Sequence, residues 1–245
     1  MLLHYNAWQI TPQSCYGFHR TYTGHGGQQA LSPPTNREKQ MIAKQDARNK
    51  KIAQRNAIPL TFRCEKSISI CNSFAAELDR IAKAADGTPS RQLNLAAYEP
   101  MRSEVDVHPL LDHAYAAGWR VFLPCMAKDA PDAPARMVFF DMPCERLSEN
   151  RPAFLDNPAR PYLLADLAAE GWQPVDVSTF DAVAVPMVAF DNGNMRLGYG
   201  GGNYDRFLPQ LREDCFVAGV AFEEQRMEEV PTEPHDLPLP RIFTA

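Results

Sequence analysis

The sequence feature that most constrains this chain is a glycine-rich stretch near residue 200. Four glycines occupy the five positions from Gly198 to Gly202, with Arg196 just before them and Asp205 just after. Glycine has no Cβ, so it reaches positive φ at little steric cost, and consecutive N–H groups can then point into one anion-binding concavity. The apolar, β-branched run 180–186 predicts a buried strand before the glycines, and residues 206–211 suit a helix after them. The stretch therefore lies between a strand and a helix N-terminus, where phosphate is commonly held.

Two familiar phosphate-binding patterns do not fit these glycines. The P-loop pattern ends in Gly-Lys-Ser/Thr, which is absent, and the dinucleotide pattern would require glycine at Asn203. Two interpretations stay open. The glycines can simply let two backbone segments pass closely, or they can cradle nucleotide phosphates with Arg196 as counter-charge. In the second case Asp205 is available to Mg²⁺, which prefers one or two carboxylates together with phosphate oxygens.

Length and composition narrow the class of protein. A chain of 245 residues suits one α/β domain with additions. The net charge of −5 argues against a general nucleic-acid binder, because the surface as a whole is not basic. The six cysteines are scattered without Cys-x-x-Cys or metal-ligand spacing, so we expect reduced thiols in a cytoplasm and neither zinc nor disulfides. No apolar run is long enough to predict a membrane span.

The first 57 residues divide into two parts. Residues 1–34 are polar with interleaved aromatic residues and no sustained periodicity, so we expect a flexible N-terminal extension before a single α/β domain at 35–245. Thr35-Asn36-Arg37-Glu38 fits a capping box and predicts a helix to residue 57. Four basic residues share one face of that helix at spacings of four, three and four: Lys44, Arg48, Lys51 and Arg55. A solvated basic face, RNA and an acidic membrane surface are the interpretations that the spacing alone allows.

The rest of the chain alternates between helical and extended patterns. Helices are expected at 68–82, 105–117 and 163–170, and strands at 93–97, 119–124, 137–140 and 215–222, with a last extended run at 241–244. This order predicts a three-layer αβα fold with a largely parallel sheet. Ligands in such folds bind at the carboxyl ends of the strands, where the glycine stretch is expected.

These residues also carry a family resemblance. Arg-Leu-Gly-Tyr-Gly-Gly-Gly followed by Tyr-Asp-Arg-Phe-Leu resembles the signature of the 5-formyltetrahydrofolate cyclo-ligase family, also called methenyltetrahydrofolate synthetases. The resemblance runs from about Lys44 to Thr244 and implies the fold shared with ribose-phosphate isomerases and CoA transferases. That family usually reads Gly-Tyr-Tyr-Asp where this chain reads Gly202-Asn203-Tyr204-Asp205.

The resemblance implies an activity and its partners. The expected reaction is the ATP- and Mg²⁺-dependent conversion of 5-formyltetrahydrofolate to 5,10-methenyltetrahydrofolate, through a phosphorylated formyl intermediate and with release of ADP and phosphate. ATP and a reduced folate are then the partners of an expected monomer, and no membrane or nucleic-acid partner is implied. The chemistry suits the residues, because phosphoryl transfer needs positioning and charge neutralisation more than covalent help.

The resemblance also assigns roles to particular positions. Lys44 and Arg48 match a Lys-x-x-x-Arg pattern that reaches ATP, which leaves Lys51 and Arg55 as surface residues. Met-Arg-Ser-Glu104-Val-Asp resembles a folate-binding stretch, with Val107 in place of a threonine, and Glu99 lines the same pocket. Asp205 and Asp236 are implied as metal ligands, and Arg196 and Tyr204 as catalytic residues. The further expected ATP contacts are Leu197, Gly198, Tyr199, Gly200, Gly201, Gly202 and Asn203, and the substrate is expected to share Gly200, Gly201, Gly202, Asn203 and Tyr204.

Two rival functions belong to other classes. A non-catalytic folate- or nucleotide-binding paralogue of the same fold would bind folate without turnover. An RNA-binding module would use the basic helix 37–55, and its affinity for RNA would fall steeply with salt. ATP-dependent formation of the methenyl product favours the enzyme over both.

Overall fold

The computed structural model describes residues 35–83, 91–148, 151–233 and 236–245. The predicted extension 1–34 lies outside the described residues, and so does His235 beside the predicted ligand Asp236. Three long helices come from the first half of the chain: α1 (Asn36–Ala57), α2 (Leu60–Ala82) and α3 (His108–Ala116). None of the helices in the described ranges is both long and apolar enough to cross a membrane.

A mostly parallel sheet forms the centre of the domain. The strands lie in the order β3, β2, β1, β5, β8, β9, with β4 beside β2, and only β3 runs antiparallel to its neighbour. Their bounds are β1 (Asn94–Ala96), β2 (Arg120–Lys128), β3 (Arg136–Asp141), β4 (Tyr162–Leu163), β5 (Ala182–Pro186), β8 (Phe216–Ala221) and β9 (Ile242–Thr244). This arrangement confirms the predicted α/β fold with a largely parallel sheet.

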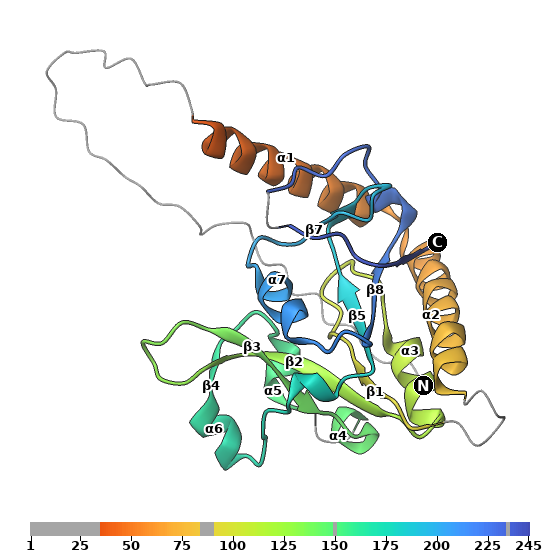
Figure 1. Ribbon diagram of the computed structural model, residues 1–245, viewed down its shortest axis with the longest axis vertical. Coiled ribbons are helices and arrows are strands. Elements are labelled where there is room, and N and C mark those ends of the chain that lie inside the picture. The colour runs from red at the N-terminus through yellow and green to blue at the C-terminus, as the bar shows by residue number, and fades with distance from the viewer. Residues whose placement is uncertain (1–34, 84–90, 149–150, 234–235) are drawn as a thin grey trace, which may run out of the picture. The chain divides into compact units, whose positions relative to one another are not determined.

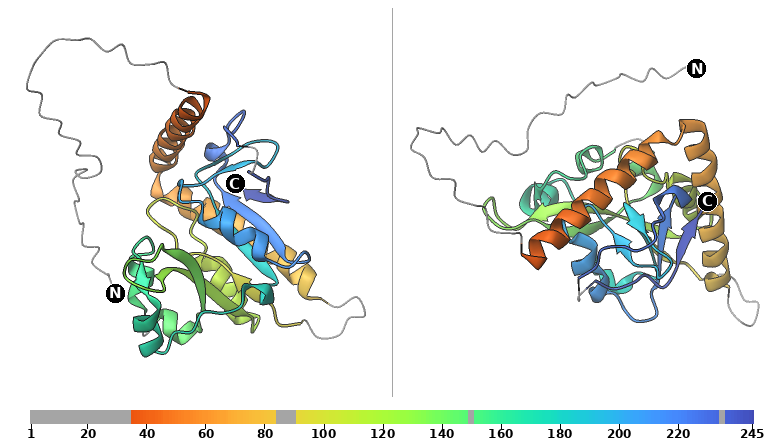
Figure 2. Two further views of the ribbon diagram at one scale, coloured as in Figure 1. Left: turned by 60° about the vertical axis from the view of Figure 1, so that its left-hand side comes forward. Right: turned by 90° about the horizontal axis from the view of Figure 1, so that it is seen from above.

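Both faces of the sheet are covered, because side chains along a strand point alternately to opposite sides. On β5, Ala182 and Ala184 join a core shared with α2 and α3, whereas Val183 and Val185 join a second core that contains Phe207 of α7 (Asn203–Phe207). Figures 1 and 2 show α2 and α7 on either side of β5 and β8. The three-layer arrangement therefore follows from the alternation along the buried strands.

Several shorter elements complete the domain. They are the helices α4 (Cys144–Ser148), α5 (Ala153–Asp156) and α6 (Leu164–Ala169), the 3₁₀ turns η1 (Val177–Thr179), η2 (Leu208–Gln210) and η3 (Glu223–Gln225), and a separate pair of strands, β6 (Ala189–Phe190) and β7 (Arg196–Leu197). Between residues 125 and 160 the structure contains β3, which the sequence predicts at 137–140, and also the end of β2 and two short helices that it does not predict.

The start of α1 confirms the capping box. The Thr35 hydroxyl accepts a hydrogen bond from the Glu38 N–H at 3.3 Å, and the Thr35 N–H donates to Glu38 Oε2 at 2.7 Å. The helix ends before Pro59, as the sequence predicts. The next helix begins eight residues earlier than its apolar periodicity suggested, at Leu60, because its first turns leave Leu60 and Phe62 exposed and so carry no buried stripe.

One connection differs from the sequence prediction. The glycines do not directly follow the buried strand β5, because the antiparallel pair β6 and β7 stands between them. Asp191 forms the turn of that hairpin: its Oδ1 accepts from the Gly193 N–H at 2.9 Å and from the Met195 N–H at 3.1 Å. Asp-Asn-Gly-Asn at 191–194 is a hairpin signal in the sequence. The glycine stretch therefore connects β7, not β5, to α7.

Candidate functional site

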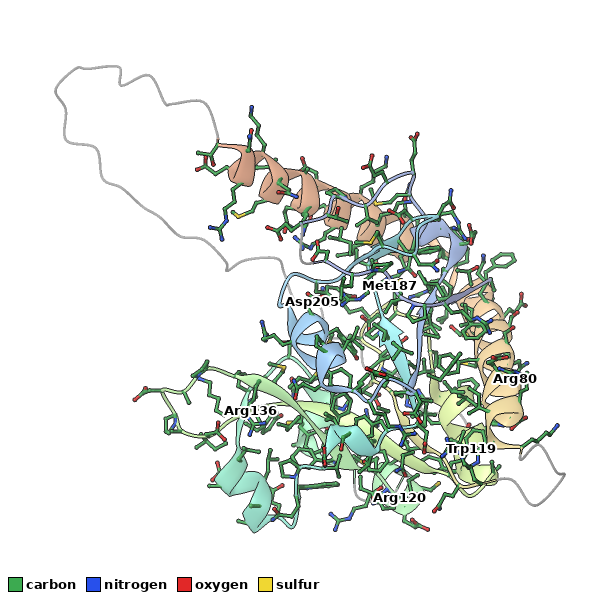
Figure 3. The ribbon with its side chains drawn as sticks, viewed as in Figure 1. Arg80, Trp119, Arg120, Arg136, Met187 and Asp205 are labelled. Carbon is green, nitrogen blue, oxygen red and sulfur yellow. The ribbon has the colours of Figure 1, made fainter. Side chains whose placement is uncertain are left out.

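The glycine stretch forms an open loop at the start of α7. Gly200 and Gly202 have φ of 99° and 62°, so the chain uses the left-handed region that glycine enters most easily. Gly202 is the residue that caps α7. Figure 3 labels Asp205 on α7 and Met187 beyond the end of β5, whereas Trp119 and Arg120 mark the opposite, amino end of β2. The loop therefore lies at the end of the sheet where ligands of α/β folds bind.

Arg48 brings a positive charge from α1 onto this loop. Its Nε donates to the Gly198 carbonyl oxygen at 2.8 Å. Its guanidinium also lies so close to Gly200 that a Cβ there would be 3.4 Å from Cζ. A Cβ at position 200 would therefore make an ordinary van der Waals contact with the arginine, and the positive φ is the reason for glycine at this position.

Lys44 lies one turn before Arg48 and contacts the end of the chain. Its ammonium bonds Glu233 Oε2 at 2.9 Å and Asp236 Oδ2 at 2.8 Å. Burial lowers the pKa of Lys44, but the hydrogen bonds and charges of Asp236 and Glu233 outweigh that effect and raise it. The predicted ATP contact and the predicted metal ligand thus lie side by side, although 192 residues separate them in sequence.

Arg196 pairs with the second predicted metal ligand. Its Nη2 lies 2.5 Å from Asp205 Oδ1, and its Nε is buried with no hydrogen-bond partner among the described residues. An unpaired buried donor costs free energy unless a ligand or water satisfies it. The unsatisfied donor of Arg196 therefore suits a site that receives an anion.

The two predicted metal ligands can be compared with what Mg²⁺ requires. Within the described ranges no three His, Cys, Asp or Glu side chains gather closely enough to hold an ion. Asp205 and Asp236 instead each bind a cationic side chain. Mg²⁺ often takes only one or two carboxylates and completes its shell with phosphate oxygens and water. These two acids therefore fit a metal that arrives together with a phosphate ligand.

Glu104 forms a second, buried part of the site. A tight turn with Arg102 at φ 57° places it after β1, where its Oε2 accepts from the Met101 N–H at 2.8 Å. Its Oε1 is buried without a hydrogen-bond partner in the described structure. Burial raises the pKa of Glu104, against the opposing effects of Met101, Tyr199 and Arg55. Burial also raises the pKa of Tyr204, and the charge of Glu104 adds to that effect. The predicted substrate acid thus interacts with two tyrosines of the loop region.

Glu99 belongs to a separate group of charges. Its Oε1 lies 2.7 Å from Arg151 Nη2, and its Oε2 lies 3.6 Å from the Nε2 of His108. His108 also bonds Asp106 at 2.7 Å, and these two acids, Asp106 first, raise its pKa to about 10. Glu99 therefore lies between two cationic side chains, its buried Oε2 accepts no hydrogen bond in the described structure, and its substrate role stays a prediction.

Comparison with known proteins places this geometry in a family. The model of the 5-formyltetrahydrofolate cyclo-ligase family matches residues 40–245. The chain belongs to this family. The Mycolicibacterium smegmatis cyclo-ligase is 30% identical over 61% of this chain and 72% of its own length, and the Escherichia coli K12 enzyme is 30% identical over 61% and 76%.

Solved structures show the same fold. The chain resembles 5,10-methenyltetrahydrofolate synthetase from Mycoplasma pneumoniae with a TM-score of 0.59 and 21% identity, over 82% of this chain and 97% of that one. The Aquifex aeolicus synthetase follows with a TM-score of 0.54 and 23% identity, over 82% and 89%. These structures confirm the predicted α/β fold, and the match to the family model confirms the family resemblance noted in the sequence.

Two residues of the basic face contradict the sequence interpretation of this cyclo-ligase chain. Lys51 and Arg55, expected at the surface, are only 8% and 2% exposed. The Lys51 ammonium donates to the Glu224 carbonyl at 3.1 Å and also to that of Arg226, and the Arg55 guanidinium donates to Tyr199, Ser103 and Met187. The face therefore points into the protein, and an RNA-binding module that needs it exposed is not supported.

The side chains of two residues expected to contact ATP, Leu197 and Asn203, make contacts within the protein. Leu197 pairs with Ala189 in the β6–β7 hairpin and its side chain is packed in a small core, so it places the loop and offers no side chain to ATP. Asn203, where the family usually has tyrosine, accepts a hydrogen bond from Arg206 at 2.8 Å and points its amide toward the sulfur of Met126. The effect of this departure on folate binding stays a prediction.

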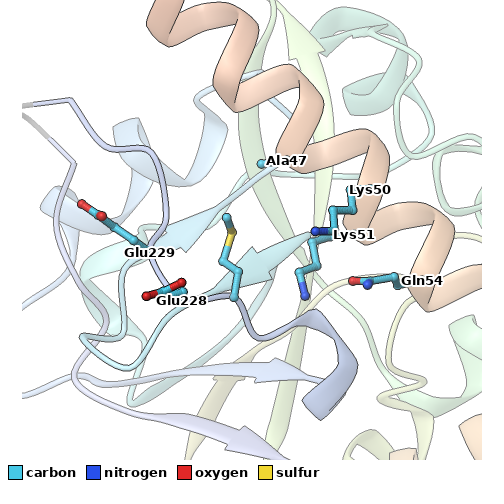
Figure 4. Close-up of a pocket in the computed structure, with 7 residues that line it drawn as sticks. Ala47, Lys50, Lys51, Gln54, Glu228 and Glu229 are labelled. Atoms are coloured by element: carbon cyan, nitrogen blue, oxygen red, sulfur yellow. The ribbon is translucent and has the colours of Figure 1, made fainter.

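A cleft of about 510 Å³ opens on the side of α1 next to the basic face. In Figure 4, Lys50, Lys51 and Gln54 from α1 stand on one side and Glu228 and Glu229 on the other. None of the residues predicted to bind ATP, folate or metal lines it. The candidate site of this cyclo-ligase is therefore the loop with its cations, not this cleft.

Proposed function

We propose that the chain is a working 5-formyltetrahydrofolate cyclo-ligase, which couples ATP cleavage to closure of 5-formyltetrahydrofolate into 5,10-methenyltetrahydrofolate. The observation that carries the proposal is the contact of Arg48 with the glycine loop, 2.8 Å from its Nε to the Gly198 carbonyl. It unites two motifs 150 residues apart, both expected to bind ATP. The identity to cyclo-ligases over most of the domain favours this enzyme over a non-catalytic paralogue.

The reaction requires an activated formyl group. The formyl oxygen of the folate attacks the γ-phosphorus of ATP and ADP leaves, which gives an iminium phosphate on the folate. N10 of the same folate then attacks the formyl carbon and loses its proton to water, and the C–O bond breaks to release inorganic phosphate. Charge accumulates on the transferred phosphoryl oxygens, so cations and N–H donors placed beside them accelerate the first step.

We assign the phosphate contacts to side chains that the free protein keeps paired. Lys44 would exchange Glu233 and Asp236 for phosphate oxygens, and Arg196 would exchange Asp205 in the same way and use its unsatisfied Nε. Arg48 and the N–H groups of the glycine loop would complete the cradle. The exchange needs no new charge in the site, because Lys44 and Arg196 leave carboxylate partners for phosphate oxygens.

Two of the three acids released by this exchange are the expected metal ligands. Bound Mg²⁺ would supply charge neutralisation of the phosphates, and Asp205 and Asp236 would hold it. Glu104 would orient the folate through its unpaired Oε1, with Tyr204 covering the reacting end. A cytoplasmic location is part of the proposal, because the scattered cysteines of the sequence indicate reduced thiols. The monomeric state stays a prediction.

The test is turnover by the purified full chain. With ATP, Mg²⁺ and 5-formyltetrahydrofolate we expect the absorbance of the methenyl product to rise in step with ADP release. Arg48→Gln should raise the KM for ATP at least tenfold, whereas Lys39→Gln, which removes the same charge from an exposed position on the same helix, should not. Folate binding without ADP release from the unmodified chain would refute the proposal.

A further inference from the structure

Arg55 is a buried cation that the proposed mechanism does not use. It is 2% exposed and donates from all three nitrogens: Nε to Ser103 Oγ at 3.1 Å, Nη1 to the Met187 carbonyl at 3.4 Å, and Nη2 to the Tyr199 hydroxyl at 2.6 Å. No carboxylate of the described residues lies within ion-pair distance of Arg55, whereas Lys44 and Arg196 each have an acidic partner. A buried charge is costly without compensation, so an acid whose carboxyl group is influenced by the charge of Arg55 matters.

That acid is Glu104, and its hydrogen bonding is incomplete. The residue is 7% exposed, its Oε2 accepts from the Met101 N–H, and its Oε1 has no hydrogen-bond partner in the described structure. The positive charge of Arg55 lowers the pKa of this carboxyl, which burial raises. Glu104 is thus a buried carboxylate with one oxygen held by the protein and one left for something else.

Tyr199 of the glycine loop connects the two. Its hydroxyl oxygen accepts the hydrogen bond from Arg55, which leaves its single proton to donate elsewhere. The hydroxyl interacts with Glu104 and lowers the pKa of that carboxyl, while burial raises the pKa of Tyr199 itself. Residue Tyr199 is nonetheless 46% exposed. Its polar end therefore points into the protein toward Arg55 and Glu104 while much of the ring faces solvent.

We propose that Arg55 and Tyr199 are positioning residues for the folate, which hold Glu104 with its Oε1 aimed at the N–H donors of the pterin ring. The inference rests on the proposed function, because that function supplies the pterin. A 2-amino-4-oxopterin presents two adjacent N–H donors, which a carboxylate accepts well. The Arg55–Tyr199 pair places a positive charge near Glu104. Because Arg55 forms no direct ion pair with Glu104, the Oε1 of Glu104 stays available to the substrate.

The arrangement also joins the two halves of the site. Arg55 lies on α1 two turns after Arg48, Tyr199 lies in the loop that Arg48 contacts, and Glu104 lies beyond β1. A shift of the glycine loop when nucleotide binds would therefore move the hydroxyl that acts on the folate acid. Glu104 carries the folate contact, and the other two residues act through it.

The pH dependence of folate binding reports on this role. The groups that interact with Glu104 are Arg55, Tyr98, Tyr199 and Tyr204, of which only the arginine is cationic. Donor groups of the pterin need the ionised carboxylate, so affinity falls as pH falls through the pKa of Glu104. Removing the Tyr199 hydroxyl removes a partner that lowers this pKa. The loss of affinity should then begin at a higher pH than in the unmodified protein.

The experiment compares Tyr199→Phe with Tyr115→Phe in the full chain. Both remove a hydroxyl that makes a 2.6 Å hydrogen bond, but the Tyr115 bond goes to the Met142 carbonyl, away from the site. We measure the dissociation constant of 5-formyltetrahydrofolate by calorimetry between pH 5 and pH 8, and the KM for ATP by turnover. Tyr199→Phe should weaken folate binding about tenfold and move its pH profile upward, and this loss should exceed any change in the KM for ATP, which Tyr199 is also expected to contact. Tyr115→Phe should change none of these quantities.

Two results would overturn the inference. One is a Tyr199→Phe protein with the folate affinity and pH profile of the unmodified chain, and the other is a loss of ATP affinity with folate binding intact. Glu104→Gln provides the reference, because a side chain that cannot ionise should give a flat profile. The binding arm needs no turnover, so an inactive but folate-binding chain would refute the proposed function and still test this inference.

Discussion

Replacing Gly200 by alanine tests whether the shape of the glycine loop serves the site. Gly200 has φ of 99°, and a Cβ there would lie 3.4 Å from the Cζ and the Nη2 of Arg48. A non-glycine residue in the left-handed region costs about 1–2 kcal/mol. The chain can relieve the strain only by moving the loop, which would stretch the 2.8 Å bond from Arg48 to the Gly198 carbonyl. Stability and nucleotide binding should therefore fall together.

The sizes of both effects follow. About 1–2 kcal/mol corresponds to a fall in Tm of about 2 to 8 °C for a domain of this length. Displacement of one cation from the cradle should raise the Kd of ATP about tenfold, equivalent to ~1.4 kcal/mol. Differential scanning calorimetry measures the first effect and isothermal titration with ATP and Mg²⁺ the second.

Gly201→Ala is the matched control for this prediction. Gly201 does not have positive φ, and a Cβ there would meet only the Asn203 side chain, at 3.4 Å. We expect its Tm to change by less than about 2 °C and its ATP affinity by less than about threefold. Equal damage from both substitutions would show that the backbone conformation of Gly200 is not the cause. An undamaged Gly200→Ala protein would refute the reasoning.

Four further predictions test single side chains. Glu233→Gln should tighten ATP binding about threefold, because an acid that competes for Lys44 is neutralised; weaker binding by titration would instead make Glu233 a nucleotide ligand. Asp205→Asn should lower turnover while leaving Tm within about 2 °C, and a variant that works at full rate removes this residue from the site. Lys51→Met should lower the free energy of unfolding by about 1–3 kcal/mol in urea at unchanged ATP affinity, since two carbonyl groups lose their donor; unchanged stability would contradict this. The pKa of His108 is raised from 6.5 to about 10, so its contribution to stability is complete below pH 6.5 and is lost as pH rises toward 10; His108→Gln should flatten that part of the pH–stability curve, and an unaltered slope would refute it.

Local sequence signals were sufficient for much of the fold. The capping box at Thr35 and Pro59 bracket α1 correctly, and the buried run before the glycines is β5. The hairpin between β5 and the glycine loop was missed although Asp191-Asn-Gly is a turn signal. Its strands have two residues each, too few for an alternating pattern to stand out from the neighbouring apolar residues.

The partners of the basic residues could not be predicted from local patterns. Lys51 donates to the Arg226 carbonyl, 175 residues away, and backbone carbonyls leave no trace in a sequence. Charge runs on helices are usually solvated, so the burial of Lys51 and Arg55 was not expected from composition. The proximity of Lys44 to Asp236 was implied only by the family resemblance, because no periodicity relates residues 192 positions apart.

The kind of hydrogen-bond partner separates Lys44 from Lys51 and Arg55, although all three lie on the basic face of α1. A buried cation must have a compensating partner, but the kind of partner decides whether it can be released. Lys51 and Arg55 bond neutral carbonyl and hydroxyl groups of the protein core, and any ligand that took their place would leave those groups unsatisfied. Lys44 bonds two half-buried carboxylates. Once phosphate binds Lys44, these carboxylates can bind a metal ion or water instead. We therefore expect Lys44 to exchange its partners during catalysis and Lys51 and Arg55 to keep theirs.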